Sequence, residues 1–262
     1  MEDILGNPVG RASPVALAGI NDFVSGFLAY EKKAENIVAA ANADPECVLA
    51  NTYAGFASMF LESPEAAGLA GRYLRRAEAA SALANPREKL LLEQLRLWIA
   101  GDVPGVQRLG EEIVAAHPRD LASVKLHQYF SFNRGDGESM LRIAEAAAPA
   151  NGENPYLHGM LAFGHEQMHQ LAEAERAARR ALELQRKEPW AQHALAHVML
   201  SGGRVREGER FMAEASETWV DLNSFMYTHN WWHKALFSIS LGDEAAVLDA
   251  FDRHVWGIEP TY

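Results

Sequence analysis

The chain has 262 residues, 48% of them hydrophobic, which is enough to bury a large core in one domain or in a series of stacked units. Its 24 Lys and Arg are outnumbered by 35 Asp and Glu, and the net charge of -11 repels phosphate backbones and anionic lipid surfaces. The composition therefore argues against nucleic acids and membranes as partners.

The single cysteine, Cys47, excludes a disulfide within the chain and suits a reducing compartment. We interpret it as a small buried apolar side chain. The first residues lack a basic segment followed by an apolar run, and no apolar run approaches the length of a membrane span. We therefore expect a cytoplasmic protein.

Residues 1–15 contain two glycines and two prolines, and we predict an extended N-terminal arm laid over the first helices. From residue 16 onward, Ala and Leu recur at helical spacing, and no alternating strand pattern of any length occurs. The sequence therefore predicts an all-α fold, with one helical domain over residues 16–262.

Prolines punctuate this region at a drifting interval near 34 residues, which is typical of tetratricopeptide repeats. Each follows a polar residue and is expected in the first turn of a helix, where a missing N–H costs nothing. The five prolines are Pro45, Pro86, Pro118, Pro155 and Pro189.

A second break inside each interval makes it a pair of helices. Gly101-Asp102, Gly135-Asp136 and Gly242-Asp243 each offer a left-handed glycine followed by a capping aspartate. We predict about twelve helices in six antiparallel pairs, with 224–255 as a further, partly irregular pair. The six lie at roughly 20–46, 46–84, 86–117, 119–148, 155–187 and 189–219.

Four motifs carry a resemblance to a known family: Tyr156-Leu-His-Gly-Met-Leu-Ala-Phe-Gly164, Trp190-Ala-Gln-His-Ala-Leu-Ala-His-Val198, His229-Asn-Trp-Trp-His-Lys-Ala-Leu-Phe237 and Phe251-Asp-Arg-His254. With them, the chain resembles the tetratricopeptide repeat protein 38 family along its whole length. The resemblance implies a right-handed α-α superhelix, that is, a tetratricopeptide-like solenoid. It implies no particular biochemical activity, because none is established for that family.

The chain is shorter at its C-terminus than members of that family usually are, because it stops at Tyr262. An uncapped end of a solenoid exposes apolar surface. We therefore expect the last helix pair to pack against another protein surface, for example in a homodimer through the C-terminal end.

Ten histidines predict roughly 0.4 pairs at a four-residue spacing by chance, whereas the sequence holds three. In the first pair, His169 falls where the repeat normally has the glycine between its helices, so we expect His165 and His169 to be split between a helix and its cap. We interpret this pair as structural. The other two pairs are His193/His197 and His229/His233.

In the resemblance to tetratricopeptide repeats, these two pairs fall on first helices of adjacent units and line a common concave groove. The favoured interpretation is that this groove binds a peptide or a small-molecule ligand, with aromatic anchors and imidazole hydrogen bonds. The candidate ligand-binding residues are Tyr156, Phe163, Glu166, His193, His197, His229, Asn230, Trp232 and His233.

Three alternatives use the same side chains. The first is a metal-dependent enzyme in which His193, His197, His229 and His233, with Glu166 as a fifth candidate, hold Zn²⁺ or a similar divalent ion. Neither pair has the adjacent Glu of a His-Glu-x-x-His motif. The second is metal-free acid–base catalysis by the imidazoles. The third is a purely structural role at a helix contact.

Overall fold

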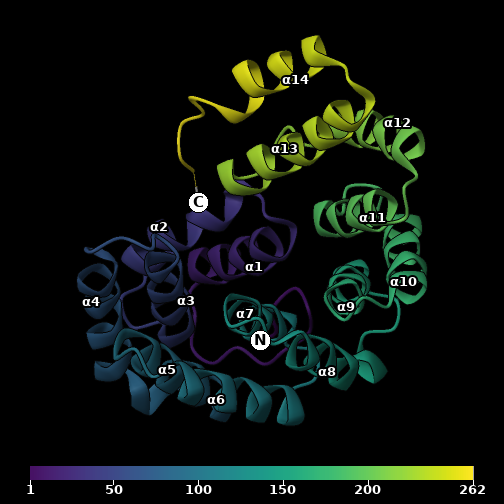
Figure 1. Ribbon diagram of the computed structural model, residues 1–262. Helices are drawn as coiled ribbons and strands as arrows, with labels where there is room; N and C mark the ends of the chain where they lie inside the picture. Colours follow the sequence, from purple (N-terminus) through teal and green to yellow (C-terminus); the bar gives the residue numbers. More distant parts are fainter. Residues whose placement is uncertain (262) are drawn as a thin grey trace. The chain divides into compact units, whose positions relative to one another are not determined.

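The computed structural model describes residues 1–261, and over this range it contains fourteen α-helices and no strand (Figure 1). The all-α prediction is confirmed. The chain forms two compact units, Met1–Asp136 and Gly137–Thr261. The single domain over residues 16–262 stays a prediction.

The first unit consists of the N-terminal arm and seven helices packed as successive hairpins. Its interior is rich in stacked and edge-on aromatic rings, such as Phe23 on Tyr53 and Trp98 on Phe130. The helices are α1 (Pro14–Ala29), α2 (Asn36–Ala43), α3 (Val48–Met59), α4 (Ala66–Ala79), α5 (Pro86–Ile99), α6 (Val103–Ala116) and α7 (Leu121–Asn133).

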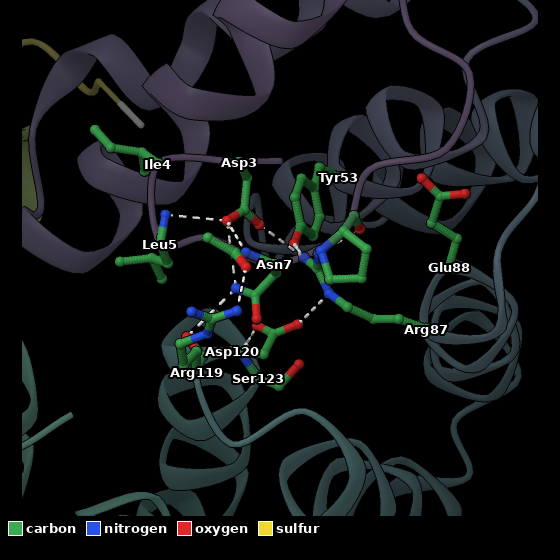
Figure 2. A network of polar contacts seen from close by, with 12 residues as sticks. Asp3, Ile4, Leu5, Asn7, Tyr53, Arg87, Glu88, Arg119, Asp120 and Ser123 are labelled. Carbon is green, nitrogen blue, oxygen red and sulfur yellow. Dashed lines mark hydrogen bonds and ion pairs between the residues drawn. The ribbon is translucent and has the colours of Figure 1, made fainter. Parts of the chain in front are cut away.

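The N-terminal arm is held by a buried ion cluster, which Figure 2 shows. The guanidinium of Arg87 is fully buried and pairs with the carboxylates of Asp3 at 3.1 Å and Asp120 at 2.7 Å. It also donates to the Tyr53 hydroxyl at 2.9 Å. Asp3 accepts the backbone N–H of Asn7 at 2.9 Å, so one side chain both closes the loop of the arm and anchors it to α5.

The second unit also consists of seven helices. Helices α9, α11 and α13 pack in succession in one row, with α10 and α12 packed against them (Figure 1). The chain then ends in a π-helical turn and an extended segment. The helices are α8 (Gly137–Ala147), α9 (Pro155–Gln167), α10 (Leu171–Leu184), α11 (Pro189–Ser201), α12 (Val205–Ser216), α13 (Ser224–Leu241) and α14 (Glu244–Ala250).

Small residues let the helices of this unit approach closely. Ala174, Ala178 and Ala181, predicted to lie at the contact of a helix pair, are fully buried on α10. A Cβ at Gly208 would lie only 2.2 Å from the Phe237 ring, so glycine is required where α12 meets α13. Successive pairs therefore share continuous interfaces, as in a repeat protein.

Three of the five prolines expected in the first turn of a helix are found there. Pro86, Pro155 and Pro189 begin their helices. Pro45 and Pro118 instead lie three residues before α3 and α7, because each stands in a turn that precedes the N-cap of its helix. In α7, for example, the N-cap is Asp120, whose side chain accepts the backbone N–H of Ser123. The six expected pairs correspond to α1 to α12, and the further pair expected at 224–255 corresponds to α13 and α14.

Candidate metal centre

Helix α11 carries His193 and His197 one turn apart on one face. The helix begins at Pro189, whose missing N–H costs no hydrogen bond there. The buried carboxylate of Glu188 accepts backbone N–H groups of the first turn, where the positive end of the helix dipole also favours it. The start of α11 is therefore fixed, and with it the direction of both imidazoles.

Helix α13 carries His229 and His233 in the same relation. It begins after Asn223, whose side chain accepts the N–H of Met226 at 3.0 Å, and it ends at Gly242 in the left-handed conformation.

Trp219, in the connection between α12 and α13, ties α13 to α11. Its buried indole donates to the Oε1 atom of Gln192 on α11 at 2.7 Å and packs edge-on against Trp231 of α13, with ring centroids 5.4 Å apart. A polar bond and an aromatic contact thus set the register between the two histidine-bearing helices.

The four side chains, hereafter the histidine cluster, bring their Nε2 atoms together. Those of His193, His229 and His233 form a triangle with sides of 2.9, 3.1 and 3.1 Å. The Nε2 atom of His197 lies 3.2 Å from that of His233. A tetrahedral zinc ion with bonds of about 2.0–2.1 Å separates its nitrogen ligands by roughly 3.3–3.4 Å. The measured separations lie within about 0.5 Å of that spacing.

Hydrogen bonding alone does not satisfy this triangle. The Nε2 atom of an imidazole carries either a hydrogen or a lone pair, so it is a donor or an acceptor but not both. Three such atoms in mutual contact always leave at least one donor–donor or acceptor–acceptor pair. A cation at the centre removes the conflict, because all the nitrogens can then direct lone pairs at it.

Burial keeps these imidazoles uncharged. Loss of hydration, followed by the neighbouring imidazoles, lowers the pKa of His193 well below its usual value. The same causes in the same order lower the pKa of His229 to about 4 and that of His233 to about 3. At neutral pH these rings are in the neutral form that binds metal ions.

Glu166 on α9 approaches the cluster from outside. Its Oε1 atom lies 3.1 Å from Nδ1 of His197, and Gln167 donates to its Oε2 atom at 2.6 Å. Burial is the largest single effect and raises the pKa of Glu166. The hydrogen bond and charge interaction with His197, together with the hydrogen bond from Gln167, outweigh it, and the pKa is lowered. A carboxylate on Nδ1 holds the hydrogen on that nitrogen and leaves Nε2 with its lone pair. Glu166 is thus placed to orient His197.

The other predicted residues lie in different settings. Phe163 is buried, with its ring centroid 5.6 Å from that of His193, and Trp232 is 46% exposed, 5.0 Å from the ring of His233. Asn230 is fully buried, and neither its amide oxygen nor its nitrogen has a hydrogen-bond partner among the described residues. Tyr156 stands ten residues before Glu166 on α9, about 15 Å along the helix axis, and Gln185 donates to its hydroxyl at 3.3 Å.

Two aromatic residues that were not predicted complete the surroundings of the cluster. Trp190 stacks on His193 at 4.7 Å and 17°, and Phe225 stacks on His229 at 5.4 Å and 17°. Each precedes its histidine by three or four residues, which is one helical turn. That spacing was the signal in the sequence that could have found them.

The pair formed by His165 and His169 does not join the cluster. His165 is in α9, whereas His169 follows the helix with a φ of +56°, the left-handed value expected at a glycine position. His165 Nδ1 is instead 2.7 Å from Oε1 of Gln170. This pair shows that a four-residue spacing alone does not bring two imidazoles to a common site.

Large apolar side chains are exposed toward the C-terminus, at Leu248, Phe251 and Trp256. The two aromatic rings stack on each other with centroids 5.9 Å apart. A homodimer through this end stays a prediction.

Among the described residues, no helix combines the length and the apolar character needed to cross a membrane.

No family model matches the chain. The solved structures that are similar to it include two at 14% sequence identity. One is the crystal structure of MamA, where the match covers 61% of this chain and 90% of that chain with a TM-score of 0.47. The other is that of PilW, a widely conserved type IV pilus biogenesis factor, where it covers 92% and 93% with a TM-score of 0.42. Membership of the tetratricopeptide repeat protein 38 family stays a prediction.

Proposed function

We propose that the protein binds a divalent transition metal ion of the zinc class through the histidine cluster. The observation that carries this proposal is the triangle of Nε2 atoms at 2.9–3.1 Å, whose contacts no arrangement of hydrogens can satisfy together. A centrally placed ion turns the same contacts into ligand–ligand separations of ordinary size.

The donor set indicates which ions fit. Imidazole nitrogen suits Zn²⁺, Cu²⁺, Ni²⁺ and Fe²⁺, whereas Mg²⁺ and Ca²⁺ prefer oxygen ligands. The carboxylate of Glu166 lies on the outer nitrogen of His197, so the inner ligands are all nitrogens. This favours a borderline ion over a hard one.

Two further features support metal binding. The imidazoles of His193, His229 and His233 are neutral at physiological pH because their pKa values are lowered, so an ion does not have to compete with a second proton on them. In addition, the contact of Glu166 with His197 is the carboxylate–histidine arrangement that fixes the orientation of a metal-binding ring.

Burial weighs against a groove in which the imidazoles themselves recognise a peptide. His193 and His233 are only 2% and 5% exposed, and Phe163 and Asn230 are also buried. An extended peptide lying over the surface would not reach these side chains. A metal ion at the centre of the cluster would bind the buried nitrogens directly, so we prefer metal binding to peptide recognition by the imidazoles.

The experiment is a titration of the metal-free protein with Zn²⁺ in competition with a chromophoric chelator. We expect one ion per chain, and the variant His233→Ala should bind at least about 100-fold more weakly, since loss of an outer partner alone costs 10–100-fold. His233→Asn checks that the loss is not a folding defect, with circular dichroism of both variants.

The matched control is the double variant His165→Ala/His169→Ala, which removes two imidazoles at the same spacing in the same unit. It should bind Zn²⁺ like the unaltered chain. Equal loss of affinity in the control and in His233→Ala, or no stoichiometric binding at all, would refute the proposal.

A further inference from the structure

The histidine cluster has a buried side and an accessible side. His193 and His233 are buried, whereas the side chain of His197 is 27% exposed and His229 is half-buried. The Nε2 atom of His197 contacts one corner of the triangle, that of His233. An external donor atom can therefore reach a bound ion only from the side of His197 and His229.

Two exposed aromatic rings border that side. Phe225 and Trp232 are 53% and 46% exposed, and their ring centroids lie 5.4 and 6.0 Å from that of His229. Residues 225, 229 and 232 are spaced four and three apart, so all three lie on one stripe of α13. Exposed aromatic rings beside a metal offer flat apolar surface to a ligand that the metal anchors.

The surrounding charge restricts the ligand further. Among the described residues, no Lys or Arg forms a hydrogen bond or ion pair with the four imidazoles, and the charged group in contact with them is the carboxylate of Glu166. A multiply charged anion such as phosphate would be repelled by Glu166, and no cationic side chain in contact with the imidazoles offsets that repulsion.

We propose that the metal centre receives a flat organic ligand of low charge, which coordinates the ion through one nitrogen or sulfur donor and lies against Phe225 and Trp232. This inference rests on the metal-binding function proposed above. Zinc-type sites can expand to five ligands, and His197 is the ligand best placed to give way.

The test uses the full chain loaded with Co²⁺, whose visible absorption reports its ligands. Benzimidazole is titrated as the flat probe, imidazole as a donor without the extra ring, and inorganic phosphate as the charged comparison. We expect benzimidazole to shift the absorption bands and to bind about tenfold more tightly than imidazole, because the extra ring adds stacking on two side chains.

Variants locate the effect. Phe225→Ala and Trp232→Ala should each weaken benzimidazole binding about three- to tenfold and leave imidazole binding unchanged within about twofold. Phe225→Leu, which keeps the apolar bulk without the flat ring, should resemble Phe225→Ala. Ile239→Ala is the control, since Ile239 is an exposed apolar residue of α13 two turns beyond Trp232.

The outcomes separate the two proposals. If Co²⁺ fails to bind, the metal-binding function is wrong and the inference falls with it. If Co²⁺ binds but benzimidazole leaves the spectrum unchanged, binds no better than imidazole, or binds equally well to both alanine variants, the metal centre stands and the ligand inference is overturned. Tighter binding of phosphate than of benzimidazole also overturns it.

Discussion

Glu166 offers the sharpest test of how the cluster is built, because its carboxylate contacts a histidine without facing the centre. In Glu166→Gln, the amide oxygen can still accept the hydrogen of His197 Nδ1, but the charge is lost. A hydrogen bond to a charged group contributes about 1.5–3 kcal/mol and a neutral one about 0.5–1.5 kcal/mol. The difference of about 1–1.5 kcal/mol predicts roughly five- to tenfold weaker binding of Zn²⁺.

The same variant should destabilise the metal-free protein only slightly. The pKa of Glu166 is lowered, so its favourable contacts outweigh the cost of its burial and the ionised carboxylate stabilises the folded chain at neutral pH. Its place in the last turn of α9, where the helix dipole disfavours a negative charge by about 0.3–1 kcal/mol, offsets part of this contribution. We therefore expect a slightly lower melting temperature with chelator present, together with reduced Zn²⁺ affinity. A purely structural role would lower the melting temperature and leave the Zn²⁺ affinity unchanged.

The assay is chelator competition for affinity and thermal unfolding for stability. Glu173→Gln is the control, because Glu173 is a surface carboxylate on α10 that pairs with Arg176 outside the cluster. If Glu166→Gln and Glu173→Gln bind Zn²⁺ equally well, within about twofold, the carboxylate does not support the centre and this reasoning is refuted.

Three further predictions concern stability and reactivity. In the metal-free protein, the unfolded chain binds more protons than the folded one between the ordinary histidine pKa and the lowered value of about 4 at His229. The free energy of unfolding should therefore fall as the pH drops from about 6.5 to 4, and His229 alone should account for about 3 kcal/mol of that fall. Denaturant titrations at several pH values should show a weaker pH dependence in His229→Asn. Asp3→Ala leaves the buried Arg87 with one fewer carboxylate and should cost about 3–5 kcal/mol in denaturant unfolding; an unchanged midpoint would show that the arm is not anchored in solution. Burial raises the pKa of the Cys47 thiol to about 11, so it should react with a thiol reagent only as fast as the chain unfolds, and rapid labelling of the native protein would contradict its burial.

Local signals in the sequence were sufficient for the helices and their breaks. A glycine followed by an aspartate encodes its own turn and cap, as at Gly101 and Gly242, which have φ values of +78° and +72°. Helical spacing likewise places His193 with His197 and His229 with His233. These features depend on neighbours within about one turn, so no knowledge of tertiary packing is needed.

Long-range packing decides the rest. Whether the two histidine pairs meet depends on Trp219 reaching Gln192 across α11, a contact between residues 27 positions apart. The ion cluster of Arg87 joins the arm to a residue 84 positions away, and no local pattern marks it. Tyr156 shares a helix with Glu166 but lies too far along its axis to reach the same ion.

The most direct test of the metal centre is a crystal structure of the protein grown with Zn²⁺, with anomalous diffraction recorded on both sides of the zinc absorption edge. We predict a single strong anomalous peak about 2.0–2.1 Å from the Nε2 atoms of His193, His229 and His233, with Glu166 still on the outer nitrogen of His197. A zinc peak elsewhere, for example at His165, or a histidine cluster whose rings have turned away from one another with no ion between them, would contradict the account.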